Sequence, residues 1–247
     1  MKIVMLYFFV FMFVLAACSP PTTPTPVPTT PPLPTKTTIP TATLEPSPTP
    51  DPLIFKDDFK DSIDTEWQWV KENDKEWSLT TNPGWLEIFA GSGSVGGGDL
   101  DNLLTRQIPE GNFELETKMI FKPVTNYQFA GLLIYESAAN HLQFGRAFCN
   151  NVQACVNDGL YMDLTMGGGF TGENFATSSP DTDTVYLRLR REDNIYTSYY
   201  SEDGNKWNLV GAHTSDMNPL FVGLAAGQST YSFQPAQFDY FVINALP

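Results

Sequence analysis

Few residues of this 247-residue chain are of the types that carry out acid–base chemistry. Its two histidines, His141 and His213, stand alone, and no motif of a catalytic base surrounds either of them. Glu114 and Glu116 alternate along a stretch that reads as a β-strand, so their carboxylates would face the same side. A retaining glycoside hydrolase needs two carboxyl groups about 5–5.5 Å apart. The pair leaves hydrolysis open, but the lack of a fuller motif favours a domain without catalysis.

Sugar binding is the second kind of chemistry that the residue types allow. Pyranose rings present C–H faces that pack on aromatic rings, and their hydroxyl groups bond to planar polar side chains. Segments 128–146 and 186–191 supply residues of both kinds. The candidates for carbohydrate binding are Tyr135, Gln143, Arg146, Tyr186, Arg188 and Arg190. The alternative for the tyrosines is a place in the core, where most aromatic residues of a β-sandwich lie.

The N-terminus has the pattern of an export signal. Lys2 precedes an apolar run over residues 3–15, which is too short for a transmembrane helix and fits a signal peptide. The run ends in LAAC at 15–18, which resembles a bacterial lipobox. This resemblance implies a signal peptide over 1–17 and a diacylglycerol on Cys18, so that the protein would be a lipoprotein of the bacterial cell envelope facing outward. The alternative is an ordinary secretory signal with Cys18 incidental.

A linker is expected between this anchor and the folded domain. Residues 18–53 hold most of the chain's 20 prolines, mixed with threonine. Such a segment has too few apolar groups to form a core, and it favours an extended polyproline II spacer. We therefore predict a lipidated cysteine and linker over 18–53, followed by one domain over 54–247.

Cys149 and Cys155 are separated by six positions. In an exported protein, two cysteines at such short range indicate a disulfide across a loop. A zinc site is disfavoured because no histidine lies near the two sulfurs. Free thiols remain the alternative.

The 54–247 region predicts an all-β fold. Along 113–121, apolar residues alternate with Glu114, Glu116 and Lys118, and the same alternation recurs along 185–190. Turn signals separate such short runs throughout the region. This pattern is typical of a two-sheet antiparallel sandwich of the jelly-roll kind.

The glycine-rich segment 91–98 has no lysine followed by serine or threonine and opens no helical pattern. A phosphate-binding loop is therefore disfavoured. We expect this segment to be a hairpin loop.

The formal net charge of −14 excludes some classes of partner. Nucleic acid binding needs a basic surface, and so does electrostatic binding to anionic lipid. We therefore expect no nucleic acid partner, and contact with the membrane through the lipid anchor only. The many carboxylates also suit Ca²⁺, although they serve solubility equally well.

Several motifs resemble the concanavalin A-like domain at the C-terminus of family 43 β-xylosidases. They are DDF at 57–59, WQWV at 67–70, the segment 77–88 with its PGWLEI ending, AGLLIY at 130–135, YLRLRR at 186–191 and the segment 199–207. The resemblance covers about residues 54–246. It implies a two-sheet jelly roll associated with carbohydrate, without implying catalysis in this domain.

Three functions remain open on this resemblance. The first is non-catalytic binding of an extracellular glycan, such as xylan or another plant-type polysaccharide. The second is a glycoside hydrolase or polysaccharide lyase on the same fold. The third is a protein-docking accessory module, because the family's domain packs on a catalytic domain. The sequence favours the first of the three.

A structural Ca²⁺ site is implied by a further resemblance, to lectin-like sandwiches of the laminarinase type. Those proteins bind Ca²⁺ where the first and last strands meet, through a carboxylate near each chain end and a glycine carbonyl. Asp58, Gly111 and Asp239 match these positions. Carboxylate and carbonyl oxygens are the ligands that Ca²⁺ prefers. The alternative is that Asp58 and Asp239 cap turns or face solvent.

Overall fold

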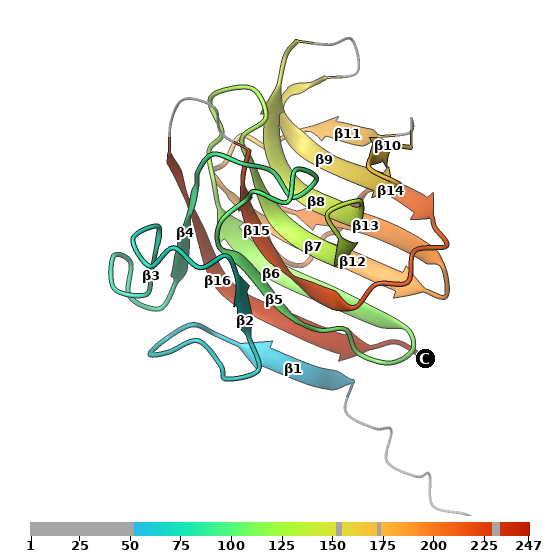
Figure 1. Cartoon of the computed structure of the whole chain (residues 1–247), viewed down its shortest axis with the longest axis horizontal. Coiled ribbons are helices and arrows are strands. Elements are labelled where there is room, and N and C mark those ends of the chain that lie inside the picture. The colour runs from blue at the N-terminus through green and yellow to red at the C-terminus, as the bar shows by residue number, and fades with distance from the viewer. Residues whose placement is uncertain (1–51, 152–154, 172–173, 229–232) are drawn as a thin grey trace, which may run out of the picture. The chain divides into compact units, whose positions relative to one another are not determined.

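The computed structural model describes residues 52–151, 155–171, 174–228 and 233–247. Its elements are the strands β1 to β16, which form two antiparallel sheets packed face to face (Figure 1). Within these ranges no helix is long and apolar enough to cross a membrane. The predicted all-β sandwich is confirmed, whereas the predicted signal peptide, Cys18 and nearly all of the linker lie outside the described residues.

Sheet A has eight strands in the order β14-β13-β12-β6-β16-β4-β3, with β1 paired to β16. Its strands are β1 (Leu53–Asp57), β3 (Trp77–Ser78), β4 (Leu86–Ala90), β6 (Phe113–Ile120), β12 (Thr184–Glu192), β13 (Ile195–Ser201), β14 (Asn208–Thr214) and β16 (Gln234–Ala245). The long β16 is the last strand of the domain and pairs with the first strand, β1, so the two ends of the domain lie side by side. It also pairs with β6.

Sheet B also has eight strands, in the order β10-β9-β8-β7-β15-β5-β2, with β11 paired to β9. Its strands are β2 (Gln68–Val70), β5 (Leu103–Gln107), β7 (Phe129–Ser137), β8 (Asn140–Cys149), β9 (Asn157–Met166), β10 (Gly169–Phe170), β11 (Phe175–Ser178) and β15 (Phe221–Gly227). The longest of these, β7, β8 and β9, are consecutive in the chain and adjacent in the sheet.

The main core lies between the sheets and follows the alternation expected from the sequence. Leu115 and Met119 of β6 are fully buried against residues of sheet B such as Leu132 and Phe144. Glu114 lies on the outer side of β6, yet it too is buried, because arginine side chains of β12 cover it. The strand pattern therefore predicts the face of a residue correctly and its exposure less well.

The glycine-rich segment is not a hairpin loop. It follows β4 of sheet A and leads to β5 of sheet B, so it crosses between the sheets. Val95 and Leu100 form a second apolar cluster with Phe129 and Leu133, on the side of sheet B that faces away from the main core. The backbone N–H of Gln228 donates to the carbonyl of Gly93 at 2.9 Å, which fastens the segment to the end of β15. The prediction failed because a hairpin requires neighbouring strands, and partner choice is not local.

Candidate functional site

The outer face of sheet B carries a cleft. Along β8, Leu142 and Phe144 point into the main core, so strand alternation turns His141 and Gln143 to the opposite face. Two hollows indent this face beside the glycine-rich segment. They share Gln143, Asp163 and Gln228, which join them into one depression that we call the sheet B cleft.

The first hollow is polar and has a volume of about 250 Å³. Its lining residues are Ser94, Gly96, His141, Gln143, Asp163, Thr165, Gly168 and Gln228. Gln228 donates from its amide nitrogen to the Gln143 amide oxygen at 3.3 Å, so two flat amides lie side by side. This end of the cleft offers hydroxyl, amide, imidazole and carboxylate groups within one small volume.

The second hollow is larger, at about 360 Å³, and its surface is mostly apolar, with aromatic rings in its wall. Tyr127, Phe129, Phe148 and Tyr161 line it together with the Cys149–Cys155 disulfide. The Tyr161 hydroxyl donates to the carbonyl of Asn157 at 2.8 Å, which fixes this ring in the wall. The cleft therefore joins a polar end to an aromatic end.

Tyr127 stands at the rim of the aromatic end, where 50% of the residue is exposed. Its φ is 74°, and Gln228 at the junction of the hollows has a φ of 65°. Left-handed backbone at a bulky residue is uncommon, and such strained positions cluster at functional sites. The backbone N–H of Tyr127 donates to the Phe148 carbonyl at 2.8 Å, and its hydroxyl bonds with Asn151. These contacts hold an exposed aromatic ring at the edge of the cleft.

Burial sets the charge state of the polar end. Desolvation raises the pKa of Asp163 to about 6, so this carboxyl is ionised at pH 7 and becomes neutral in mild acid. Burial also lowers the pKa of His141, which keeps the imidazole neutral at pH 7. Its Nδ1 is buried and has no hydrogen-bond partner within the described part of the chain. The polar end therefore carries a single negative charge beside neutral groups.

The predicted disulfide is confirmed. Cys149 and Cys155 are bonded, with their Cα atoms 5.1 Å apart. Both cysteines line the aromatic end of the cleft. Beside them, the backbone N–H of Asn150 donates to the Asn126 side chain at 2.7 Å. The bridge and Asn151 thus form part of the cleft wall.

The carbohydrate-binding candidates on sheet B have three different placements. Gln143 lies on the floor of the cleft. Tyr135 lies on the same face and packs against the second apolar cluster, outside both hollows. Arg146 is only 2% exposed; its Nε and Nη2 donate to the Asp158 carboxylate at 2.8 and 2.6 Å, and Nη1 donates to the Thr182 carbonyl at 2.7 Å. The structure therefore assigns Arg146 to holding the fold, with all its nitrogens engaged.

The other three candidates lie on β12, on the outer face of sheet A. Arg188 bonds to Glu116 at 2.7 Å and to Glu114 at 3.1 Å, and Arg190 bonds to Glu114 at 2.5 Å. Arg188 also covers Trp207, with 3.8 Å between the guanidinium carbon and the ring centre. Tyr186 packs near Lys118 on this same face, so these candidates are far from Gln143 and on the other sheet.

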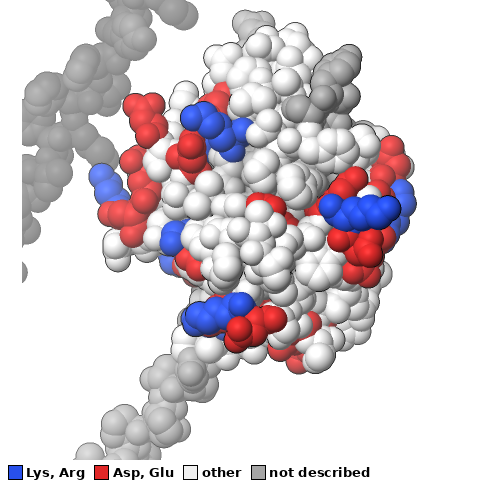
Figure 2. Space-filling model, turned by 90° about the vertical axis from the view of Figure 1, so that its left-hand side faces the viewer, with Lys and Arg blue, Asp and Glu red and all other residues white. Residues whose placement is uncertain are grey.

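The two glutamates considered for hydrolysis are therefore engaged in ion pairs. Glu116 also accepts a hydrogen bond from the Tyr240 hydroxyl at 2.7 Å. Similar pairing of opposite charges is visible in Figure 2, where Lys and Arg side chains lie beside Asp and Glu side chains on the face drawn. Glu114 and Glu116 thus act as counter-ions for the arginines of β12.

The three predicted calcium ligands do not form one group. Asp58 bonds to Lys60 and Asp239 bonds to Lys118, each at 2.7 Å. Asp239 lies beside the pairing of Tyr240 with Lys118, whereas Gly111 lies just before Phe113, at the opposite end of β6. Among the described residues, no group of three or more His, Cys, Asp and Glu side chains could hold a metal ion. Binding of Ca²⁺ at Asp58 and Asp239 stays a prediction, with Gly111 removed from the set by the register.

The neighbour of Asp58 has the structural role instead. The Asp57 carboxylate accepts hydrogen bonds from the backbone N–H groups of Phe59 and Asp64 and from the indole N–H of Trp67, each at 2.9 Å. The Trp67 ring packs edge-on against Phe241, with 4.9 Å between ring centres. Asp57 therefore organises the turn after β1 and fastens it to β16.

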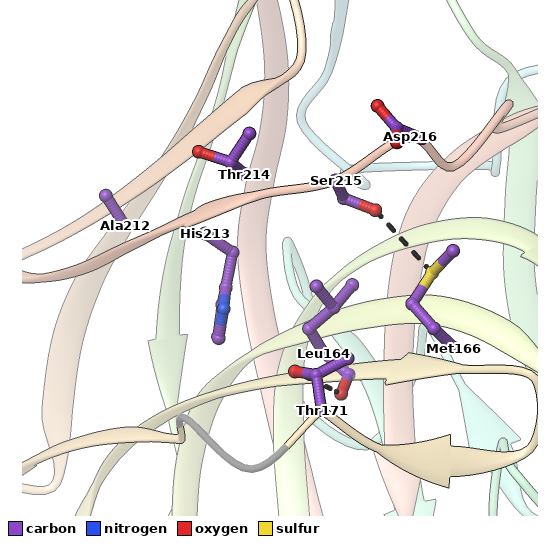
Figure 3. A pocket seen from close by; sticks show the side chains of 8 residues that line it. All are labelled: Leu164, Met166, Thr171, Ala212, His213, Thr214, Ser215 and Asp216. Carbon is purple, nitrogen blue, oxygen red and sulfur yellow. Dashed lines mark hydrogen bonds between the residues drawn. The ribbon is translucent and has the colours of Figure 1, made fainter.

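A third hollow, of about 460 Å³, lies between β9 and β14 and contains His213 (Figure 3). Ser215 and Asp216 also line it, so the residue types of a nucleophilic relay are present. Their side chains do not converge, because the Ser215 hydroxyl points to the Met166 sulfur at 3.5 Å and Asp216 points away from His213. His213 Nε2 lies 3.3 Å from the Met162 carbonyl. Neither Ser215 nor Asp216 is directed at the imidazole, so these residues of the hollow pack together without forming a relay.

Sequence reasoning missed most residues of the cleft. Asp163, Tyr161 and Thr165 alternate along β9 with Leu160, Met162 and Leu164, which is the pattern of a strand with one polar face. That signal was available. His141 stands alone in the sequence, but in the sheet it neighbours Thr165 across the β8–β9 pairing.

Comparison with known proteins gives the family. The family model of the beta xylosidase C-terminal concanavalin A-like domain matches residues 56–244. A xylan 1,3-beta-xylosidase of a Vibrio species is 29% identical in an alignment 196 residues long that covers 68% of this chain and 33% of that protein. A putative beta-xylosidase of Escherichia coli is 27% identical in an alignment 210 residues long that covers 77% of this chain and 38% of that protein. The chain thus spans little more than a third of the length of these curated relatives.

A solved structure shows the same fold. The GH43 BlXynB protein of Bacillus licheniformis superimposes with a TM-score of 0.69 at 20% identity, over 77% of this chain and 39% of that chain. The match covers the sandwich, and at 20% identity it shows a shared fold only. Because the family model extends over most of the sequence, the chain belongs to the family of the beta xylosidase C-terminal concanavalin A-like domain.

Proposed function

We propose that this domain binds an extracellular polysaccharide in the sheet B cleft without cleaving it. The relatives named as xylosidases make a xylan-type chain the first ligand to test. The proposal extends to the whole protein as a lipoprotein of the bacterial cell envelope, held by a lipid on Cys18 and facing outward.

The observation that carries the proposal is the composition of the cleft. Aromatic rings at one end offer faces for sugar C–H groups, and amides and a carboxylate at the other end offer partners for hydroxyl groups. Tyr127 is exposed at the rim, whereas Gln143 and Asp163 lie on the floor. Ligand sites combine apolar walls with a few convergent polar groups in this way.

Binding without hydrolysis is supported by the carboxylates. Most glycoside hydrolases act with a pair of carboxyl groups that flank the scissile bond. Asp163 is the one carboxylate among the described residues that line the cleft. Glu114 and Glu116 lie on the other sheet and are paired with arginines.

The test is calorimetric titration of the protein with a linear xylo-oligosaccharide, supported by an array of neutral plant polysaccharides. We expect Gln143→Ala to weaken binding at least tenfold, because its amide lies on the cleft floor. Tyr186→Ala, on the outer face of sheet A, is the matched control and should bind as the wild type does. A reducing-end assay on the same samples should show no release of sugar. Unchanged affinity in Gln143→Ala would place the binding site elsewhere, and sugar release that depends on Asp163 would identify a hydrolase.

A further inference from the structure

We propose that the sheet B cleft selects uncharged glycans and rejects those bearing uronic acids, and that Asp163 makes this selection. The inference rests on the proposed function and adds a class of ligand to it. It is drawn from the position of one carboxylate and from the charges around it.

Asp163 occupies the junction of the cleft. It is the residue of β9 that lies directly across from Gln143 of β8, and it lines both the polar and the aromatic hollow. A sugar that spans the two hollows must therefore pass over this carboxylate. An ionised carboxylate accepts hydrogen bonds and donates none, so sugar hydroxyl groups suit it and another carboxylate does not.

The described lining of the cleft offers Asp163 no positive charge as a partner. Among the described residues that line the two hollows there is neither lysine nor arginine. The segments 152–154, 172–173 and 229–232 also contain no lysine or arginine in their sequences. The arginine of the neighbouring strand β8, Arg146, is buried on the core side of that strand and is bound to Asp158.

The other titratable groups add no cation at neutral pH. His141 of β8 is kept neutral by burial, and Tyr161 of β9 has a pKa raised by burial. The glycine-rich segment brings Asp99, whose carboxylate accepts a hydrogen bond from the Ser94 backbone N–H at 2.9 Å. Gln228, which directly follows β15, lines the cleft with a neutral amide. A uronic acid in the cleft would thus meet negative charge without a counter-ion.

The selection should depend on pH. Burial raises the pKa of Asp163 to about 6, so the carboxylate is charged at pH 8 and largely neutral at pH 5. A uronic acid stays ionised at pH 5. We expect a neutral xylo-oligosaccharide to bind at least tenfold more tightly than the same chain with one glucuronic acid branch at pH 8. This ratio should fall toward one at pH 5.

The experiment measures the dissociation constants of both oligosaccharides by calorimetry at pH 8 and pH 5. Asp163→Asn keeps the size of the side chain and removes its charge, so the ratio in this variant should be close to one at both pH values. Asp216→Asn removes one negative charge from an exposed residue outside the cleft, and it should keep the ratio of the wild type.

The outcomes separate this inference from the proposed function. Tight binding of both ligands with a ratio near one at pH 8 overturns the selection and leaves glycan binding standing. A ratio that persists in Asp163→Asn assigns selection to another group and overturns the role of Asp163. Failure of the wild type to bind either oligosaccharide counts against both. Should Asp163→Asn fail to fold, the pH dependence of the wild-type ratio decides alone.

Discussion

Asp163 and Gln143 face the same side of sheet B from directly opposed positions on β9 and β8. The Gln143 amide oxygen also accepts a hydrogen bond from the Gln228 amide nitrogen at 3.3 Å. A carboxylate and two amides thus form the floor where the two hollows of the cleft meet.

The ionised Asp163 side chain should cost the folded protein stability at neutral pH. Burial raises its pKa from 3.8 to about 6, so the carboxylate binds its proton more tightly in the folded state than in the unfolded chain. Stability is then highest below the unfolded pKa and falls as the pH rises from about 4 to about 6. We expect Asp163→Asn to be more stable than the wild type at pH 8, by at most about 3 kcal/mol at roughly 1.4 kcal/mol per pKa unit.

Urea denaturation of both proteins at pH 8 and at pH 4 measures this difference. The gain should vanish at the lower pH, where the wild-type carboxyl is protonated as well. Asp216→Asn, at an exposed position, is the control and should change little at either pH. A variant less stable than the wild type at pH 8 would mean that favourable contacts hold the charged form.

Tyr127 should contribute to binding and hardly to stability. Half of the residue is exposed, so its removal leaves little of the core uncovered. Aromatic contacts contribute about 0.5–1.5 kcal/mol beyond the area that they bury, so Tyr127→Ala should weaken xylo-oligosaccharide binding roughly threefold to tenfold. Tyr127→Phe keeps the ring and should bind within about twofold of the wild type. Calorimetry that gives equal affinities for the alanine variant and the wild type would remove Tyr127 from the site.

Arg146 should matter for folding. Its substitution by alanine leaves Asp158 without its bidentate partner and the Thr182 carbonyl without a donor. Loss of one partner from a buried ion pair costs about 3–5 kcal/mol, and the partial exposure of Asp158 favours the lower end of this range. Arg190→Ala is the control and should cost less than Arg146→Ala, because Glu114 keeps its ion pair with Arg188 and the Arg190 side chain is itself 36% exposed. Urea denaturation that ranks the two variants equally would contradict this assignment.

The lipid anchor can be tested directly. Expression in a bacterium fed a labelled fatty-acid analogue should label the protein, and Cys18→Ala should abolish the label, because its sulfur is the proposed attachment site. Equal labelling of the two proteins would exclude Cys18 as the modified residue.

The sequence by itself determined the features that depend on neighbouring positions. Strand alternation is a local property with a period of two, so the all-β sandwich and the burial of Leu115 and Met119 could be predicted. The Cys149–Cys155 disulfide could also be predicted, because a separation of six residues limits the loop that joins the two sulfurs. Alternation along β9 would have marked Asp163 as an outward polar residue in the same way.

Only the tertiary structure decided which of these faces meet. The cleft is formed where the β8–β9 pair, the end of β15 and the glycine-rich segment 91–98 come together, although these three parts of the chain are far apart in the sequence. Register also placed Gly111 at the far end of β6 from Asp239, and it paired Arg188 and Arg190 with the glutamates of β6. Strand pairing is fixed by packing across the whole sandwich, since a shift of one residue would turn every side chain to the other face. Local patterns give the two faces of each strand, and long-range pairing selects the neighbours that make one face a site.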